Sequence, residues 1–296
     1  MIYTFFILSN LDISLVIVFR MYYNIIIGGD MKARVITATV LALIAIPVFI
    51  FGGFWFKLAF YFVSLQGLRE YINVREKRKE FPNVMKLISY ICLTLLYFGG
   101  VINKDLIINF DFRIVTGLLL ILFLPIILYN DKNKYNINDS SYLFGGVMLI
   151  SSSMILANLY RTIGLRIITY LFIITILTDV FALFTGMLIG RHKLIENVSP
   201  KKTWEGFIGG ALISTFSATV FYITVINTNA SLLVIILFTL FLSIVGQFGD
   251  LFFSAVKRYY KVKDFSNIMP GHGGILDRLD SIIFVILAYS LFMNII

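Results

Sequence analysis

The run Ser231-Leu-Leu-Val-Ile-Ile-Leu-Phe-Thr-Leu-Phe-Leu-Ser-Ile-Val-Gly-Gln-Phe-Gly-Asp-Leu-Phe-Phe253 carries a single ionisable residue, Asp250, near its end. About 20 consecutive apolar residues are enough for a helix to cross the hydrocarbon core of a bilayer. The whole chain of 296 residues has this character, with 59% hydrophobic and 14% charged residues, whereas a soluble domain carries about 25% charged residues. The sequence therefore predicts an integral membrane protein.

Further apolar runs predict that the chain crosses the membrane repeatedly. We expect an all-α, polytopic integral membrane helix bundle of about nine transmembrane helices. The expected spans are residues 35–55, 57–74, 87–103, 114–130, 142–160, 165–189, 207–227, 231–253 and 279–296. The polar connectors between them are short, so residues 31–296 are predicted to form one transmembrane domain, with its chemistry in the C-terminal part, about 175–285.

The first 30 residues stand apart from this domain. The run Met1–Tyr23 is apolar but contains Asp12 and Arg20. It predicts either a tenth span, an uncleaved signal-like segment, or an extension without a structural role. Met31 would be a natural start for the domain itself.

The formal net charge of +9 does not indicate nucleic-acid binding, because Lys and Arg gather in the cytoplasmic loops of a multi-span protein. If the nine spans alternate from a cytoplasmic start, seventeen Lys and Arg residues fall on the cytoplasmic side. Five fall on the other side, namely Lys57, Lys104, Arg113, Arg161 and Arg166. This asymmetry predicts a multi-pass protein of the plasma (inner) membrane with loops 190–206 and 254–278 facing the cytoplasm.

A cysteine, a carboxylate and three glycine pairs stand out inside or beside the expected spans. Cys92 is the only cysteine, which excludes an internal disulfide and a cysteine-based metal site. Asp179 lies in the middle of a span, where a carboxylate faces a wet or paired interior; a structural hydrogen bond to a neighbouring span is the alternative. The glycine pairs are expected to let helices approach closely. They are Gly99-Gly100, Gly145-Gly146 and Gly209-Gly210.

The first charged loop, 190–206, ends in Ser199-Pro-Lys-Lys-Thr-Trp-Glu-Gly206. Lys201 and Lys202 directly precede an expected helix that Thr203 could cap. Helix N-termini carry free N–H groups and a partial positive charge, so this arrangement suits a polyphosphate. The alternative is a basic cytoplasmic loop without a ligand. His192 is interpreted as a solvated loop residue.

The second charged loop follows the run quoted first and reads Ser254-Ala-Val-Lys-Arg-Tyr-Tyr-Lys-Val-Lys-Asp-Phe-Ser-Asn-Ile-Met-Pro-Gly-His-Gly-Gly-Ile-Leu-Asp-Arg-Leu-Asp280. If the preceding helix continues, Lys257 and Arg258 project two turns beyond Asp250, near the same face. A carboxylate and two cations at one depth can hold a metal and the phosphates it bridges.

The end of this loop adds a turn and two more carboxylates. Met269-Pro-Gly-His-Gly-Gly274 cannot be helical throughout, and its N–H groups could bind an anion. Asp277 and Asp280 then stand at i and i+3 of the entering helix, a spacing that suits Mg²⁺. Arg278 could pair with Asp250 or bind phosphate. An Asp-Arg-Asp ion network that only locks two helices together is the alternative.

The motifs in both loops resemble those of the phosphatidate cytidylyltransferase (CDP-diacylglycerol synthase) family. The family pattern has a Ser, Lys-Arg, Lys-Asp, His-Gly-Gly and Asp-Arg-x-Asp in this order. Here they are Ser254, Lys257-Arg258, Lys263-Asp264, His272-Gly273-Gly274 and Asp277-Arg278-Leu279-Asp280. The Ser199–Gly206 segment resembles the family's second landmark, and Met31-Lys-Ala-Arg-Val resembles its start. Two positions depart from the pattern: Met269 replaces another apolar residue, and Phe253 stands where many members have Glu.

The resemblance implies a Mg²⁺-dependent enzyme that converts CTP and phosphatidate into CDP-diacylglycerol and pyrophosphate at the bilayer. Asp250, Asp277 and Asp280 would hold Mg²⁺, with Asp179 as a further candidate ligand and K⁺ as a candidate second cation. The catalytic candidates are Lys257, Arg258, His272, Asp277 and Asp280. The candidates for substrate binding are Ser199, Lys201, Lys202, Ser254, Lys263, Asp264, Gly273, Gly274 and Arg278. A homodimer is a further expectation.

Other functions fit parts of the sequence. A CTP-dependent polyprenol or dolichol-type lipid kinase, or an ether-lipid cytidylyltransferase, would also bring CTP to a membrane lipid. An anion transporter would use Asp179 and the basic loops as a pathway. The charged groups gather at one face instead of crossing the bilayer, and no clear internal repeat is present, which argues against the transporter.

Overall fold

The computed structural model describes residues 30–102, 112–129, 134–226, 230–269 and 271–292. The extension predicted for residues 1–30 lies outside this part of the chain, apart from Asp30. The described helices are α2 (Asp30–Phe51), α3 (Gly53–Glu76), α4 (Asn83–Ile102), α6 (Phe112–Phe123), α7 (Pro125–Tyr129), α8 (Ile137–Ile163), α9 (Leu165–Ile189), α10 (Trp204–Phe221), the π-helical turn η1 (Tyr222–Ile226), α11 (Leu232–Tyr259) and α12 (Leu276–Ser290).

These helices confirm the predicted membrane bundle. Each expected span coincides with a helix, and α6 and α7 together occupy the fourth, because Pro125 has no N–H to continue α6. Five of the described helices are long and apolar enough to cross a bilayer by themselves. They are Asn83–Ile102, Ile137–Ile163, Leu165–Ile189, Trp204–Ile226 and Leu232–Tyr259.

One departure from the all-helical expectation lies in the loop between α9 and α10. Strands β1 (Lys193–Ile195) and β2 (Ser199–Thr203) pair antiparallel there as a hairpin. Thr203 caps α10 as predicted, and its hydroxyl accepts a hydrogen bond from the Gly206 N–H at 3.1 Å. The hairpin therefore holds Lys201 and Lys202 on a strand that leads directly into a helix.

Close helix packing depends on some of the predicted glycines. A Cβ on Gly210 of α10 would lie 2.7 Å from the Thr178 carbonyl oxygen of α9. Gly209, Gly100 and Gly146 are similarly crowded by side chains of neighbouring helices, whereas Gly99 and Gly145 face open space. The prediction of close helix approach is thus confirmed for both members of Gly209-Gly210. In each of the other two pairs it is confirmed for the second glycine only.

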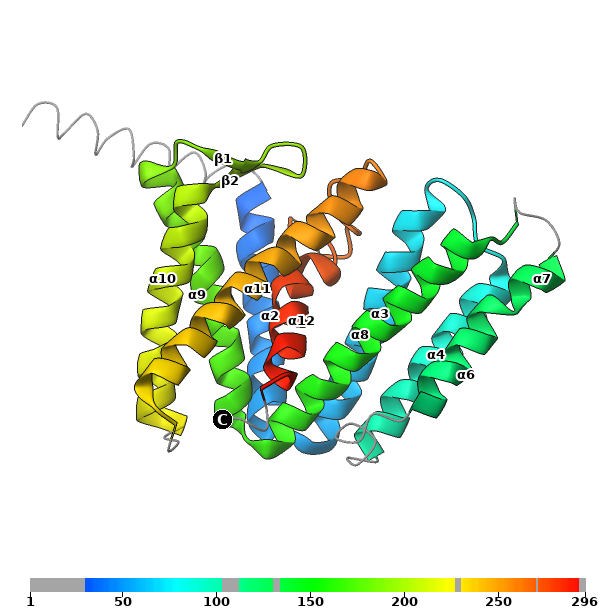
Figure 1. Cartoon of the computed structure of the whole chain (residues 1–296), viewed down its shortest axis with the longest axis horizontal. Coiled ribbons are helices and arrows are strands. Elements are labelled where there is room, and N and C mark those ends of the chain that lie inside the picture. The colour runs from blue at the N-terminus through cyan, green and yellow to red at the C-terminus, as the bar shows by residue number, and fades with distance from the viewer. Residues whose placement is uncertain (1–29, 103–111, 130–133, 227–229, 270, 293–296) are drawn as a thin grey trace, which may run out of the picture.

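Helix α12 packs against α11, α8 and α9, and thereby links the two halves of the bundle (Figure 1). Its buried face includes Ile282, Ile283 and Ile286. The Tyr289 ring of α12 meets the Tyr160 ring of α8 edge-on, with centroids 4.9 Å apart. Since α12 begins directly after the second charged loop, this packing fixes the loop against the centre of the bundle.

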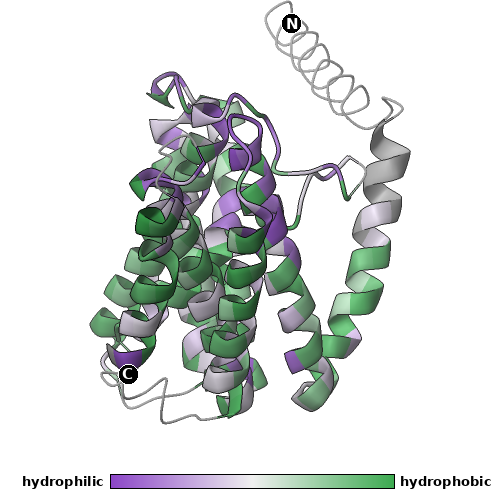
Figure 2. Cartoon of the chain, turned by 90° about the vertical axis from the view of Figure 1, so that its right-hand side faces the viewer, coloured by the Kyte–Doolittle hydropathy of each residue, from purple (hydrophilic) through white to green (hydrophobic). Residues whose placement is uncertain are grey.

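The polar connectors gather at one end of the bundle. The β1–β2 hairpin, the described loop residues 260–269 and 271–275 and the α3–α4 connection all lie at that end (Figure 1). Figure 2 shows most of the hydrophilic residues at the same end. The α2–α3 and α8–α9 junctions at Gly52 and Gly164 lie at the opposite end. The two charged loops therefore lie on the same side of the membrane bundle.

Candidate active site

Asp277, in the first turn of α12, organises the second charged loop. Its Oδ1 accepts a hydrogen bond from Lys257 Nζ at 2.6 Å, and only 5% of the Asp277 side chain and 10% of the Lys257 side chain are exposed. Its Oδ2 accepts the N–H groups of Phe265 at 2.8 Å and Gly274 at 2.9 Å. A carboxylate with three such donors is strongly held, so Asp277 ties the end of α11 to the loop and to the start of α12.

The glycine-rich turn folds back on itself. Met269 and Gly273 exchange backbone hydrogen bonds, each of 3.0 Å. Gly271 and Gly273 have φ values of 74° and 86°, a region in which a side chain would be strained. Gly274 has no space for a side chain, since a Cβ there would lie 2.5 Å from Glu70 Oε2. The turn thus requires glycine for positive φ values and for close approach to Glu70, as the sequence predicted.

Glu70 of α3 binds the loop on both sides of the same turn, and no sequence motif predicted this role. It is fully buried. Its carboxylate accepts the Ser266 hydroxyl at 2.7 Å and the N–H groups of Ile275 at 3.0 Å and Leu276 at 2.9 Å. It therefore satisfies the free N–H groups at the start of α12. An ionisable residue inside the expected span 57–74 was the signal that could have revealed it.

The two charged loops meet at Asp250 of α11. Asp250 forms an ion pair with Lys202 of the β1–β2 hairpin. Ser254, one turn further along α11, donates its hydroxyl to Asp250 Oδ1 at 3.3 Å. Arg258 adds a second connection, because its Nε donates to the Val198 carbonyl of the hairpin at 3.3 Å. The structure thus brings together two motifs that are about fifty residues apart in the sequence.

Three carboxylates from three helices interact electrostatically near these ion pairs. Asp179 of α9 interacts electrostatically with Asp250. Asp280 of α12 interacts with both Asp250 and Asp179. Asp179 is exposed, whereas Asp250 and Asp280 are half-buried. Asp179 interacts with Asp250 and also with Ser281 of α12, so both sequence interpretations of this residue, a site carboxylate and a structural contact to a neighbouring span, remain predictions.

The described carboxylates do not form a ready-made metal site. Within the described ranges, no three His, Cys, Asp or Glu side chains are arranged so that they could hold a metal ion. Both oxygens of Asp277 already accept hydrogen bonds from Lys257 and two N–H groups. The predicted metal role of Asp250, Asp277 and Asp280 therefore stays a prediction, and in this arrangement the Asp277 carboxylate holds the loop.

Arg278 and His272 form a separate contact. Arg278 donates from Nε and Nη2 to the His272 carbonyl oxygen, at 2.9 Å and 2.6 Å. The suggested pairing of Arg278 with Asp250 is wrong, because Asp250 pairs with Lys202 instead. Arg278 thus braces the glycine-rich turn, and no described residue forms a hydrogen bond with His272 Nδ1.

The remaining predicted residues lie at the same end of the bundle with fewer contacts. Lys201 and Lys263 are exposed, and Ser199 and Asp264 are half-buried. In the described part of the chain, neither Lys201 nor Lys263 forms an ion pair, so both remain available to a ligand. His192 is largely exposed and pairs with Glu205 through its Nδ1 at 2.6 Å, which agrees with its interpretation as a loop residue.

Phe253, the departure noted in the sequence, is a core residue. It is fully buried, and its ring meets that of Phe265 at 5.7 Å and that of Phe284 at 6.2 Å. Lys257 Nζ lies 5.4 Å from the centroid of the Phe265 ring, a geometry in which a cation is attracted to the ring. Phe253 thus supports the Lys257–Asp277 pair through packing.

These features define a class of protein: a polytopic helical membrane protein with paired cations and carboxylates around a glycine-rich turn at one end. The chain belongs to the cytidylyltransferase family, whose model matches residues 32–296. It is 35% identical to a phosphatidate cytidylyltransferase of Staphylococcus haemolyticus over 257 residues, which cover 86% of this chain and 96% of the relative. A phosphatidate cytidylyltransferase of Staphylococcus aureus is 33% identical over 262 residues, with the same coverage.

Proposed function

We propose that this chain transfers CMP from CTP to phosphatidate and so forms CDP-diacylglycerol and pyrophosphate. The family membership and the names of the similar staphylococcal proteins support this reaction. The structural observation that carries it is the meeting of the two charged loops at the Lys202–Asp250 and Lys257–Asp277 ion pairs. The two pairs contribute cations from two segments, the hairpin and α11, and a triphosphate and a phosphomonoester would both need such neutralisation.

The reaction requires positioning and charge stabilisation more than a protein nucleophile. A phosphate oxygen of phosphatidate forms a bond to the α-phosphorus of CTP, and the bond from that phosphorus to the α–β bridging oxygen breaks. The electron pair leaves on pyrophosphate. Fixed cations at the phosphates lower the cost of bringing these anions together and of the developing charge.

The cations of the site suit this task in different ways. Lys202 and Lys257 are preorganised by their carboxylate partners. Lys201 is exposed beside Lys202 on the strand that enters α10. We propose that Lys201 and Lys202 bind the β- and γ-phosphates, and that Lys257 and Arg258 lie nearer the reacting phosphorus. The N–H groups at the start of α10 add a partial positive charge to the first pair.

The donor set fits a magnesium ion that is bound together with the nucleotide. Mg²⁺ takes one or two carboxylates and completes its shell with phosphate oxygens and waters, so a complete protein cage is not required. Asp179, Asp250 and Asp280 offer hard oxygen ligands and repel one another, and a cation would offset this repulsion. When bound, the ion would neutralise phosphate charge and orient the triphosphate. Asp277 would hold the surrounding loop.

We further propose that this end of the bundle faces the cytoplasm across the plasma membrane. The last turn of α3 and the connectors at this end carry Arg75, Lys79, Lys134, Lys193 and Lys263. Among the residues that the structure describes, the opposite end has fewer cations, such as Arg161 and Arg166 beside the α8–α9 junction. Cytoplasmic loops carry the excess of Lys and Arg, and the nucleotide is available on that side.

A double-label assay tests the reaction. Purified protein in mixed micelles would receive phosphatidate, Mg²⁺ and CTP labelled at either the α- or the γ-phosphate. We expect the α-label to appear in the lipid and the γ-label in pyrophosphate. Transfer of the γ-label to a lipid alcohol, with release of CDP, would contradict the proposal and identify a lipid kinase.

Removal of divalent ions tests the metal separately. With an excess of chelator we expect turnover to fall at least about a hundredfold, because the charge of the triphosphate would be left without its counter-ion. Mg²⁺ added back should restore it. Turnover that is insensitive to chelation would contradict the magnesium proposal and leave the transfer reaction itself standing.

A further inference from the structure

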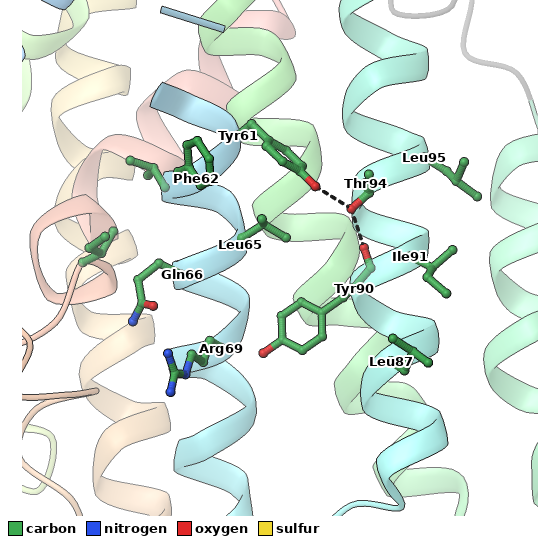
Figure 3. A pocket seen from close by; sticks show the side chains of 12 residues that line it. Tyr61, Phe62, Leu65, Gln66, Arg69, Leu87, Tyr90, Ile91, Thr94 and Leu95 are labelled. Carbon is green, nitrogen blue, oxygen red and sulfur yellow. Dashed lines mark hydrogen bonds between the residues drawn. The ribbon is translucent and has the colours of Figure 1, made fainter. Parts of the chain in front are cut away.

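A groove of about 840 Å³ runs between α3 and α4, on the outer surface of the bundle (Figure 3). Its lining is mostly apolar and includes Phe62 of α3 and Leu87, Ile91 and Leu95 of α4, all of which are exposed. The three α4 residues are spaced by four, so they form one stripe along that helix. The groove therefore opens sideways toward the hydrocarbon region of a membrane.

A cation lies at one end of this apolar groove. Arg69 of α3 lines the groove and is exposed. Among the described residues it has no ion pair or hydrogen bond, whereas Arg75 on the same helix pairs with Asp139. Gln66, one turn earlier on α3, and Tyr90 of α4 line the same end (Figure 3). Arg69 lies about 10 Å before the end of α3 at Glu76, since a helix rises about 1.5 Å per residue.

An arginine at this position is well placed to bind an anionic partner. A charged side chain on the membrane face of a helix is costly unless it reaches the interface or meets a counter-charge. The guanidinium group is well suited to a phosphate, because it can donate two parallel hydrogen bonds to it. A phosphate at Arg69 with hydrocarbon along Ile91 and Leu95 matches the two ends of a phospholipid.

The groove also reaches the proposed active site. Ile275 forms part of its wall. The Ile275 N–H is bound by Glu70, and Ile275 lies two residues before Asp277, whose carboxylate pairs with Lys257. Glu70 in turn accepts a hydrogen bond from Gln66 of the groove at 3.2 Å. A lipid phosphate at Arg69 would thus lie against the loop that carries the site.

We propose that the α3–α4 groove binds phosphatidate, with its acyl chains along α4 and its phosphate at Arg69. This inference rests on the proposed function, because it assigns the lipid substrate of that reaction to a place on the protein. The lipid enters sideways from the bilayer, and Arg69 holds its phosphomonoester next to the glycine-rich turn. Arg69 is a substrate-binding residue at the entrance, so it affects the lipid more than the nucleotide.

The first experiment separates the lipid from the nucleotide. In mixed micelles, we expect Arg69→Gln to raise the KM for phosphatidate about tenfold and to leave the KM for CTP unchanged. Arg69→Lys should recover part of this loss, because it keeps the charge. The matched control is Lys77→Gln, which removes an exposed cation one residue beyond the same helix and outside the groove; it should behave like the unsubstituted protein.

The second experiment tests the apolar part of the groove. Ile91→Trp fills it, and we expect it to raise the KM for long-chain phosphatidate several-fold while the KM for a short-chain analogue changes less. The control is Leu128→Trp on α7, which adds the same ring to a residue that is 82% exposed and lies outside the groove. An equal effect of both tryptophans would contradict the proposal.

A binding measurement gives a readout that does not depend on turnover. A phosphatidate analogue with a photoreactive group in its acyl chain should label α3 and α4 peptides of the full chain. Unlabelled phosphatidate should compete with it better than phosphatidylglycerol does. Equal competition by the two lipids would show only general lipid contact and would overturn the proposal.

The outcomes distinguish this inference from the proposed function. If the unsubstituted protein forms no cytidine lipid, the proposed reaction fails, whatever the labelling shows. If it is active and Arg69→Gln leaves the KM for phosphatidate unchanged, the reaction stands and the groove assignment fails.

Discussion

At the scale of single residues, Asp277 has a structural role that its sequence pattern did not predict. Its spacing from Asp280 predicted a pair of metal ligands. In the structure its two oxygens are occupied by Lys257 and by the N–H groups of Phe265 and Gly274. Asp277 thus shapes the loop, whereas Asp280 interacts electrostatically with Asp250 and Asp179.

Substitution of Asp277 by Asn should reduce turnover at least about a hundredfold. The amide keeps one acceptor oxygen but turns its NH₂ toward a donor, so either Lys257 or the two N–H groups lose their partner. Formation of CDP-diacylglycerol would be measured beside the yield of inserted protein. Glu80→Gln, at an exposed position of the same end, is the control; full activity of the Asp277 variant would contradict this role.

Glu70 makes a prediction about stability. Glu70→Ala removes the acceptor for the Ile275 and Leu276 N–H groups and for the Ser266 hydroxyl. Each buried donor left without a partner costs about 1–3 kcal/mol, so we expect a loss of at least about 3 kcal/mol. Unfolding in mixed micelles would measure it against Glu80→Ala, which removes an exposed carboxylate. A midpoint unchanged by Glu70→Ala would contradict this view of the loop.

Phe253 gives a further prediction at this scale. It is enclosed by Phe265 and Phe284, so Phe253→Glu would bury a carboxylate among aromatic rings. We expect lower stability, because an unpaired buried charge is costly. Phe253→Leu keeps an apolar side chain and should be much milder. If thermal unfolding in micelles showed Phe253→Glu to be as stable as Phe253→Leu, this side chain would not be part of the core.

At the scale of elements, the α9–α10 contact determines where the hairpin lies. Gly206 and Gly210 of α10 approach the backbone of α9 so closely that a Cβ would lie 2.6 Å from the Ala182 carbonyl oxygen and 2.7 Å from that of Thr178, respectively. The hairpin joins these two helices, and it carries Lys202 to Asp250. The packing of two apolar helices therefore sets the position of a polar ion pair.

Gly210→Ala should destabilise the bundle even though alanine favours helices. The gain in helix propensity is about 1 kcal/mol, whereas an additional methyl group in a tight contact costs about 1–3 kcal/mol. Gly145→Ala on α8 has the same propensity gain and no atom within 4 Å of its new methyl group, so it should be neutral or stabilising. Equal unfolding midpoints for the two variants would contradict the close α9–α10 packing.

At the scale of the whole molecule, the gathering of polar connectors at one end makes the orientation testable. Cys92 is buried, so the labelling of a single introduced cysteine can be measured with little labelling of the native one. We expect a membrane-impermeant maleimide to label Glu196→Cys, on the exposed β1–β2 turn, only from the cytoplasmic side. Thr162→Cys, at the C-terminal end of α8 on the opposite side of the bundle, should be labelled only from outside. The reverse labelling pattern would contradict the proposed orientation.

The sequence predicted much of this architecture because its signals are local. The length and hydropathy of a run such as 231–253 are enough to predict a membrane-spanning helix. The glycines at 271, 273 and 274 likewise indicate a turn whose backbone needs unusual φ values. Glu70 and the Lys202–Asp250 pair were not foreseen, because their partners lie far away in the sequence and no local pattern joins them.

The sequence by itself determined that this protein is a membrane helix bundle with two charged loops on one side, because hydrophobicity, charge and glycine content act within each segment. Only the tertiary structure decided which cation meets which carboxylate. Those pairings depend on how α9, α10, α11 and α12 pack, and this packing is set by contacts between residues that are distant in the chain. In the loop from Ser254 to Asp280, the local sequence thus specifies the glycine-rich turn. The packing of the whole bundle specifies which residues the loop contacts.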